Sequence, residues 1–179
     1  MNGHNVIYSS GANYRFLKPG IYVYSKYTYT NGAVCTTLDV RFKRPHDPWE
    51  NNAAMSAKVV HTIQHLGSEF LHSHPVWSDK VILFSPMGSK TGFYLVLAGD
   101  YRVVKDSDIH RLIMDMCRFI VNYEGEIPNA TPIHCGNCTE HNLRSAKRQT
   151  ALYLKALTKS PCFEYPVSES AGNTRLAST

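Results

Sequence analysis

Two runs of alternating residues flank an Asn31-Gly32 pair, and this pattern constrains the fold more than any other. Between residues 20 and 43, apolar side chains recur at every second position on each side of the pair. Successive side chains of a β-strand point to opposite faces, so the alternation predicts two half-buried strands. Asn-Gly is a preferred pair for a tight turn. We therefore predict an antiparallel hairpin whose polar face carries Asp39 and Arg41.

Helices and further strands are expected along the rest of the chain. Apolar residues at spacings of three and four predict amphipathic helices over roughly residues 55–72, 106–123 and 139–158. Two shorter apolar runs, at 81–86 and 91–99, are typical of strands. This order of elements predicts an α+β fold in which helices cover an antiparallel sheet.

The length of 179 residues favours one folded domain. Residues 1–16 are polar and aperiodic, and we expect them to form a loose N-terminal arm. Residues 17–158 are expected to form the metal-binding domain discussed below. The Ser/Pro/Gly-rich segment 159–179 is expected to be a flexible, frayed tail.

Composition excludes several classes of protein. The 19 Lys and Arg exceed the 14 Asp and Glu by only five, and they form no clustered stripe, so no nucleic-acid partner is expected. No run of about 18 apolar residues predicts a membrane span. Residues 1–15 lack the pattern of a secretory signal. With an odd count of five cysteines, these features favour unpaired thiols in a reducing compartment, and we expect a cytoplasmic protein.

A pair of histidines on the first predicted helix indicates a metal site. His61 and His65 are four residues apart, which places both imidazoles on one face of a helix, one turn apart. A His-x-x-x-His pair is a common way to bind zinc or a similar divalent ion. The alternative is two ordinary histidines on the polar face of the helix.

Cys135 is the best candidate for a third ligand. It lies in the segment HCGNCTEH, and a set of two His and one Cys leaves one tetrahedral position open for water or substrate, which is the pattern of a catalytic site. Cys135 and Cys138 could instead begin a structural zinc knuckle, together with His141. No second Cys pair completes that motif.

Gln64, which directly precedes the second histidine, bears on whether the site can transfer protons. In His-x-x-Gln-His, Gln64 stands where the inverted zincin motif has a glutamate that acts as general base. Glutamine has nearly the shape of glutamate and can bind a water or a hydroxyl group, but it cannot accept the proton.

Four segments together resemble one enzyme family. VVHTIQHLGSEFLHSHP, SPMGSKTGFYLVLAGDY, YEGEIPNATP and HCGN are similar to the LuxS-type S-ribosylhomocysteine lyases, over about residues 17–157 in collinear order. The resemblance implies an α+β homodimer with active sites at the subunit interface. It also implies Fe²⁺, often replaced by zinc or cobalt, bound by His61, His65 and Cys135. Cleavage of the thioether of S-ribosylhomocysteine would release homocysteine and the precursor of a quorum-sensing signal.

The sequence departs from the family pattern at the residues that move protons. The catalytic Cys of the family aligns with Ser89, its neighbouring Arg with Lys90, and the Glu of the metal helix with Gln64. A thiol titrates near ~8.5 and can be tuned towards neutrality. A serine hydroxyl is a far weaker acid and needs a neighbouring base.

Lys90 and two further positions are expected to bind substrate. A histidine of the family that helps to bind substrate aligns with Tyr14. Arg41 matches the strand arginine of the family, which suggests a contact with the carboxylate or sugar end of the ribosyl thioether.

The sequence thus predicts a metal-binding scaffold whose proton chemistry has been lost or altered. One alternative is a working lyase in which Ser89 and a metal-bound hydroxide move the protons. A second is a non-catalytic subunit that binds the ribosyl thioether or forms a heterodimer with an active homologue. There are two weaker alternatives. One is a member of the family that keeps only the aldose–ketose isomerisation, and the other is a structural domain stabilised by zinc.

Overall fold

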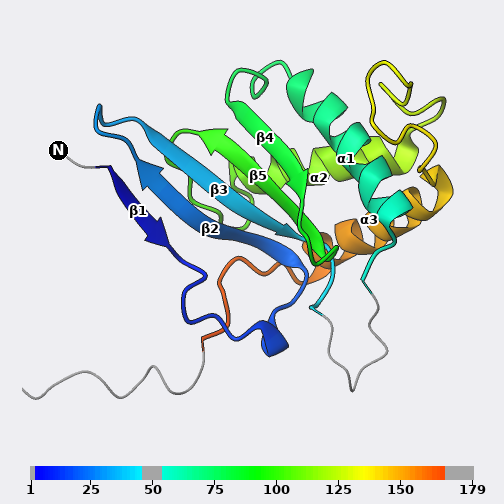
Figure 1. Ribbon diagram of the computed structural model, residues 1–179. Helices are drawn as coiled ribbons and strands as arrows, with labels where there is room; N and C mark the ends of the chain where they lie inside the picture. The colour runs from blue at the N-terminus through cyan, green and yellow to red at the C-terminus, as the bar shows by residue number, and fades with distance from the viewer. Residues whose placement is uncertain (1–2, 46–53, 168–179) are drawn as a thin grey trace, which may run out of the picture.

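A computed structural model describes residues 3–45 and 54–167 of the chain. Among these residues, five strands form one antiparallel sheet in the order β1-β2-β3-β5-β4 (Figure 1). The strands are β1 (His4–Ile7), β2 (Gly20–Thr28), β3 (Val34–Arg41), β4 (Val81–Pro86) and β5 (Gly92–Ala98).

The predicted hairpin is confirmed as β2 and β3. Thr28 pairs with Val34 at the end next to the turn, and the turn contains Gly32 at a φ of +84°. A left-handed backbone conformation costs glycine nothing but is strained for most other residues, which explains the glycine at this position.

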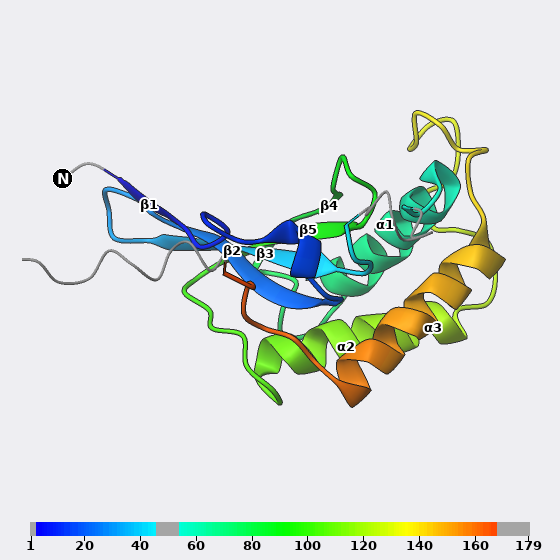
Figure 2. The same cartoon turned by 90° about the horizontal axis from the view of Figure 1, so that it is seen from below.

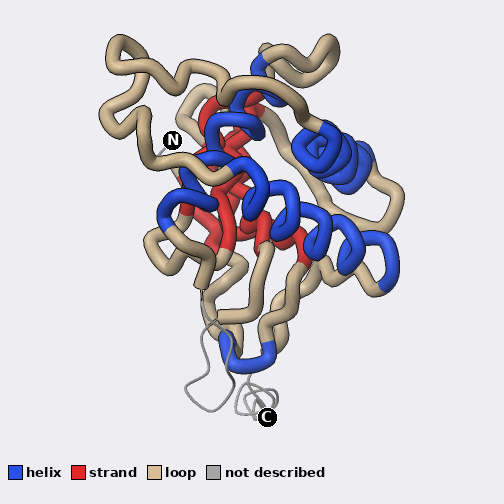
Figure 3. Tube along the Cα trace, turned by 90° about the vertical axis from the view of Figure 1, so that its right-hand side faces the viewer, coloured by secondary structure: helices blue, strands red, loops and turns tan. Residues whose placement is uncertain are grey.

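Three α-helices lie in the described part of the chain, namely α1 (Ala57–His72), α2 (Asp108–Asn122) and α3 (Leu143–Lys159). Helices α2 and α3 lie side by side beneath one face of the sheet, and α1 packs against β4 and both other helices (Figures 2 and 3). The predicted α+β fold is therefore correct. None of the helices described is long and apolar enough to cross a lipid bilayer.

The apolar stripe of α1 fixes how this helix is turned. Val59, Ile63, Leu66 and Leu71 are at most 5% exposed in the core between helices and sheet. Full burial of such a side chain contributes about 1.5–3 kcal/mol. Because this stripe faces the core, His61 and His65, which lie on another face of α1, are available to bind a ligand.

The N-terminal segment is more ordered than its sequence suggested. Residues 4–7 pair with β2, and a turn of 3-10 helix covers Tyr14–Phe16. The expectation of a loose arm is therefore wrong for the described residues 3–16. The four residues of β1 are all exposed, so no apolar alternation marks the strand, and its pairing depends on backbone hydrogen bonds.

The segment after α3 is also fixed to the body of the protein. The Cys162 carbonyl accepts a hydrogen bond from the Ile21 amide, and the Pro166 carbonyl accepts one from the Asn13 amide. The expectation of a frayed tail is therefore wrong as far as residue 167, and residues 168–179 lie outside the described part. Backbone groups make these contacts, so the amino-acid composition of the segment does not predict them.

Helix α3 begins four residues later than predicted. The side chain of Asn142 accepts a hydrogen bond from the Ser145 amide and caps the helix. The preceding residues, 139–141, therefore belong to the loop between α2 and α3. This difference matters because it places His141 in that loop.

Candidate metal centre

Helix α1 and the loop between α2 and α3 bring four potential ligands together. His61 and His65 project from one face of α1, and the loop, which arches beside that helix (Figure 2), supplies Cys135 and His141. One ligand atom from each of the four residues lies within 4.8 Å of all the others.

The closest of these atoms have the spacing of a metal site. His61 Nε2 is 3.0 Å from His65 Nε2 and 3.3 Å from Cys135 Sγ. Zinc bonds of ~2.0–2.1 Å to nitrogen and ~2.3 Å to sulfur place two tetrahedral ligand atoms roughly 3.3–3.6 Å apart. The three atoms therefore need only a small outward movement to surround one ion.

The outer nitrogens of both α1 histidines are fixed by backbone carbonyls. His61 Nδ1 lies 3.1 Å from the carbonyl oxygen of Glu140, and His65 Nδ1 lies 2.7 Å from that of Pro128. A carbonyl only accepts, so each Nδ1 carries its proton and donates it. The two Nε2 lone pairs therefore face each other across 3.0 Å. A bound cation removes this repulsion, and a His ligand whose other nitrogen donates to a carbonyl is the usual arrangement at metal sites.

The sulfur of Cys135 is oriented in the same way. The Asn137 amide donates a hydrogen bond to Cys135 Sγ at 3.4 Å, and the Cys135 amide donates to the Thr131 carbonyl at 2.9 Å. These bonds hold the side chain towards α1, and the thiolate is the form of a cysteine that binds metal. The set of two imidazoles and one thiolate fits a divalent ion such as Fe²⁺ or Zn²⁺.

The structure brings the three ligand candidates predicted from the sequence into one cluster. It also adds His141, which the sequence suggested only together with Cys138, and Cys138 is not part of the cluster. Burial, and then the nearness of His61 and His65, lowers the pKa of the His141 imidazole. The spacing on either side of Cys135 gave no reason to prefer His141 over Cys138, because only the path of the loop decides which side chain turns inward.

Gln64 and Lys90 line a hollow next to the cluster. The hollow has a volume of about 410 Å³, and His61 and Glu140 also face it. The amide nitrogen of Gln64 lies 3.5 Å from Ser68 Oγ, which is at most a weak hydrogen bond. Glu140 contributes a carboxylate to the same hollow, and Asn137 Nδ2 donates to it at 2.7 Å. The sequence-based prediction missed this carboxylate.

Ser89 belongs to a different group of side chains, which we call the strand network and which comprises Ser89, Thr91, Arg41, Asp39 and Tyr165. Ser89 Oγ is 2.8 Å from Thr91 Oγ1, to which Arg41 Nη1 donates. Arg41 Nη2 forms a buried ion pair with Asp39 at 2.6 Å. Tyr165 donates to the same carboxylate at 2.9 Å.

The strand network lies on the sheet face that α2 and α3 do not cover, because Asp39 and Arg41 alternate with the core residues Leu38 and Val40. Burial raises the pKa of Asp39, and the charge of Arg41 opposes that shift. The Arg41 guanidinium also lies 5.8 Å from the centre of the Tyr14 ring. The two substrate-binding candidates on this face are therefore neighbours.

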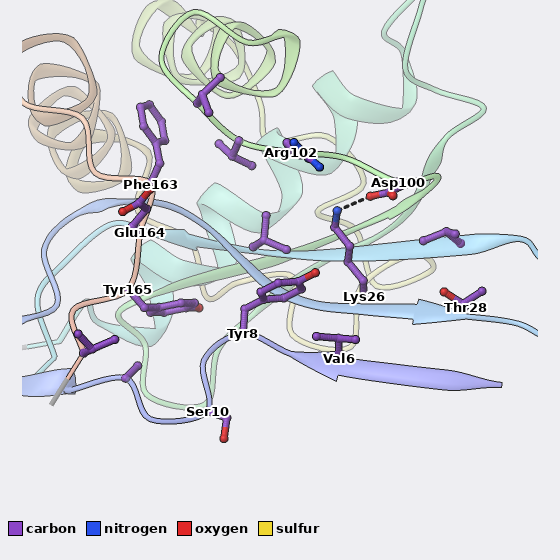
Figure 4. A pocket seen from close by; sticks show the side chains of 16 residues that line it. Val6, Tyr8, Ser10, Lys26, Thr28, Asp100, Arg102, Phe163, Glu164 and Tyr165 are labelled. Atoms are coloured by element: carbon purple, nitrogen blue, oxygen red, sulfur yellow. Dashed lines mark hydrogen bonds and ion pairs between the residues drawn. The ribbon is translucent and has the colours of Figure 1, made fainter. Parts of the chain in front are cut away.

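A larger pocket lies at the outer end of the sheet, away from the cluster (Figure 4). Its volume is about 700 Å³, and its walls come from β1, β2, residues 100–104 and residues 163–167. Lys26 is paired with Asp100 there, and the rings of Tyr8 and Tyr165 line one side. None of the four clustered ligand residues lines this pocket.

Comparison with known proteins identifies one family. The model of the family described as S-ribosylhomocysteinase (LuxS) matches residues 7–162. An S-ribosylhomocysteine lyase of Borreliella burgdorferi is 41% identical over 153 residues, which is 84% of this chain and 92% of the relative. The lyase of Phocaeicola vulgatus is 40% identical over 154 residues, with 84% and 90% covered. That of Porphyromonas gingivalis is 41% identical over 139 residues, with 78% and 82% covered.

Proposed function

Since this chain belongs to the LuxS family of S-ribosylhomocysteinases, we propose that it is a metal-binding member whose carbon–sulfur lyase activity on S-ribosylhomocysteine is lost or altered. His61, His65 and Cys135 would hold Fe²⁺ or Zn²⁺. Such an ion, when bound, supplies Lewis-acid polarisation of a carbonyl or hydroxyl oxygen. A cytoplasmic location is part of the same proposal.

One observation carries the proposal. The two side chains at the proton-transfer positions, Gln64 and Ser89, are neutral at physiological pH and do not titrate there. Ser89 has Thr91 as its nearest polar partner, at 2.8 Å, and a second hydroxyl is not a base that can activate it. Loss of one general acid or base typically costs ~10²–10⁴-fold in rate, and two groups that act as a unit leave little when both are absent.

Substrate binding has more support than substrate conversion. Lys90 lines the hollow beside His61, and its ammonium group can attract an anionic ligand. Arg41 and Tyr14 lie together on the uncovered face of the sheet. We assign these three residues to binding of the ribosyl thioether.

A homodimer fits the exposed apolar residues of the same sheet face. Ile82 and Leu83 on β4 are 55% and 50% exposed. Covering such an apolar edge is the usual reason for a second subunit. We propose that a second copy of the chain covers this face and that Arg41 and Tyr14 then face the interface.

The test is an assay of homocysteine release after metal analysis has established the metal load. The wild type should release little or no homocysteine. The Gln64→Glu/Ser89→Cys double variant should release it at least ~10²-fold faster, because it regains both titrating groups. Ala98→Gly, on β5, is a control that leaves the site untouched. Release by the wild type as fast as by the double variant would refute the proposed loss, and no release by either protein would place the defect outside Gln64 and Ser89.

Glu140 favours one second candidate, a lyase that works by a different proton acceptor. Its carboxylate lines the same hollow as His61 and Gln64, and a carboxylate is a group that can serve as a general base. In that case the wild type releases homocysteine, and Glu140→Gln lowers the rate ~10²–10⁴-fold. Activity that is absent from the wild type, or that survives in Glu140→Gln, excludes this role.

A further inference from the structure

The surplus positive charge of the chain is located in one helix. Helix α3, from Leu143 to Lys159, contains five Lys and Arg and no Asp or Glu. Subtracting these five from the 19 Lys and Arg of the chain leaves 14, which equals the number of Asp and Glu. The formal net charge of +5 is therefore the charge of α3.

The helical period places four of these five cations on one side of α3. At about 100° per residue, they lie within a sector of about 60°, opposite the side chains that α3 buries against the core. The expectation that Lys and Arg form no clustered stripe is therefore wrong for this helix. The exposed residues on this side, which we call the α3 outer face, are Arg144, Arg148, Ala151, Leu152, Lys155 and Lys159.

The cations of the α3 outer face differ from those of the neighbouring helix in their partners. On α2, Arg111 and Arg118 are each paired with an aspartate three residues earlier, at 3.8 and 2.6 Å. Among the described residues, no carboxylate forms an ion pair with the α3 outer face. The positive charge of this face is therefore uncompensated within the described chain.

This arrangement is unfavourable for the helix itself. Arg144 and Arg148, and likewise Lys155 and Lys159, are four residues apart, and like charges at this spacing repel and destabilise a helix. The first turn contains Arg144 and no acidic residue, which also opposes the helix dipole. An anionic partner on the α3 outer face would offset both effects.

An exposed leucine among the cations narrows the class of partner. Leu152 is 55% exposed and lies between Arg148 and Lys155. An apolar centre with a polar rim is the usual anatomy of a protein interface. Single-stranded nucleic acids stack on exposed aromatic rings, but Tyr153, the aromatic residue of α3, is 1% exposed. A helix that binds lipid needs a free apolar face, and α3 buries its apolar face in the core.

We propose that the α3 outer face binds an acidic amphipathic helix of a partner protein. Carboxylates repeated every four residues along that helix would have the same axial spacing as the cations, about 6 Å, and an apolar side chain would cover Leu152. The inference goes beyond the proposed function and does not depend on the metal site. Helix α3 lies on the side of the sheet opposite the face assigned to the second subunit, so its outer face stays accessible in that dimer (Figure 2).

The experiment uses the full chain and measures the affinity for defined probes at about 50 and about 300 mM salt, which differ in how strongly they screen charge. The first probe is a synthetic helical peptide with Glu repeated every four residues and a central Leu on the same face. The second is the same peptide with Gln in place of Glu. Duplex DNA of equal negative charge and vesicles that contain phosphatidylserine are the remaining probes.

The wild type should bind the Glu peptide more tightly than every other probe, and the affinity should fall as salt rises. Arg148→Ala/Lys155→Ala should weaken this binding about 10-fold, which is the upper range for two exposed ion pairs. Arg111→Ala/Arg118→Ala is the matched control, because it removes the same charge from α2, and it should stay within about 2-fold of the wild type. Leu152→Ala should weaken binding of the Glu peptide about 4-fold, as for one buried methylene.

Several outcomes would overturn the inference. Equal losses in the two double variants would attribute binding to net charge and not to the α3 outer face. Leu152→Ala with wild-type affinity would remove the apolar contact that favours a protein. Tighter binding of DNA or of the vesicles would replace the protein partner by a nucleic acid or a lipid surface. A wild type that does not distinguish the Glu from the Gln peptide, or binds neither, would leave no acidic partner. Homocysteine release tests the proposed function separately from all of these measurements.

Discussion

The metal cluster and the strand network are both polar, yet they satisfy their polar atoms in opposite ways. In the strand network, each of the five side chains has a partner within the group, and Arg41 neutralises Asp39. In the cluster, the histidine nitrogens that face outward are bonded, whereas those that face inward meet each other, the Cys135 sulfur or no partner. The first group is neutral in charge as folded, although Asp39 Oδ1 and Arg41 Nε have no hydrogen bond. The second leaves inward-facing nitrogens that a bound cation would satisfy.

This difference separates stability from function in a testable way. Damage to the strand network should lower the free energy of unfolding with no added ligand. Damage to the cluster should chiefly lower metal affinity. Three predictions test this separation and a fourth measures an exposed ion pair outside both groups, from the largest expected effect to the smallest.

Asp39→Ala should lower the free energy of unfolding by about 3–5 kcal/mol, because it leaves the buried guanidinium of Arg41 without its counter-charge. Urea denaturation of the metal-free protein measures this loss. Asp115→Ala is the matched control, since it breaks an exposed pair with Arg118 at the same 2.6 Å distance and should cost under ~1 kcal/mol. Similar losses in both variants would contradict the special role of the buried pair.

Cys135→Ser should weaken Zn²⁺ binding by more than ~10²-fold, since the hydroxyl is a far poorer ligand than the thiolate and even outer partners are worth ~10–100-fold. The control is Cys138→Ser, three residues along the same loop and outside the cluster. Chelator competition gives both affinities. Equal weakening in the two variants would argue for the zinc knuckle instead.

Tyr165→Phe should flatten the fall in stability at alkaline pH. Burial, and then the Asp39 charge and hydrogen bond, raises the pKa of Tyr165. Above pH ~10 the unfolded chain therefore loses this proton first, and stability falls as pH rises, by at most ~1.4 kcal/mol per pH unit and less where water screens the partly exposed ring.

The measurement for Tyr165→Phe is a series of denaturation curves from pH 8 to 11. The variant should be less stable than the wild type at pH 8, because a hydrogen bond is lost, but should lose less stability above pH 10. Tyr29→Phe, at an exposed ring, is the control. Parallel curves for wild type and Tyr165→Phe would contradict the prediction.

Asp100→Asn should have the smallest effect, ~0.2–1 kcal/mol on the free energy of unfolding. Its partner Lys26 lies at the edge of the large pocket, and Asp100 is 64% exposed, so water and salt screen the pair. Repeating the measurement at 1 M salt should abolish the difference. A loss that persists at high salt would show that the pair is shielded from solvent.

The sequence was most informative where local patterns decide the structure. The alternation around Asn31-Gly32 predicted β2 and β3, and the apolar spacing of α1 placed His61 and His65 on its free face. Cys135 was found because it lies in the Cys- and His-rich segment HCGNCTEH and is followed by Gly136. These features depend on neighbours in sequence or on residue type alone.

Long-range contacts account for what the sequence did not reveal. His141 joins the cluster through Thr62, 79 residues earlier in the chain. Tyr165 reaches Asp39 over 126 residues. The strand β1 carries no apolar alternation at all. In each case the contact forms between residues that are far apart in the sequence, and no local spacing of residues predicts which of them come together.

The attachment of residues 162–167 to the N-terminal segment has a topological consequence. Ala12 pairs with Val167, and the Asn13 amide donates to Pro166 at 2.7 Å, so the two outermost described segments run side by side. Because Ala12 and Val167 lie next to each other, the chain can be joined there by a linker and opened at another exposed turn. A circular permutant that opens in the turn between β2 and β3 would keep the metal cluster and the strand network, because neither depends on where the chain begins.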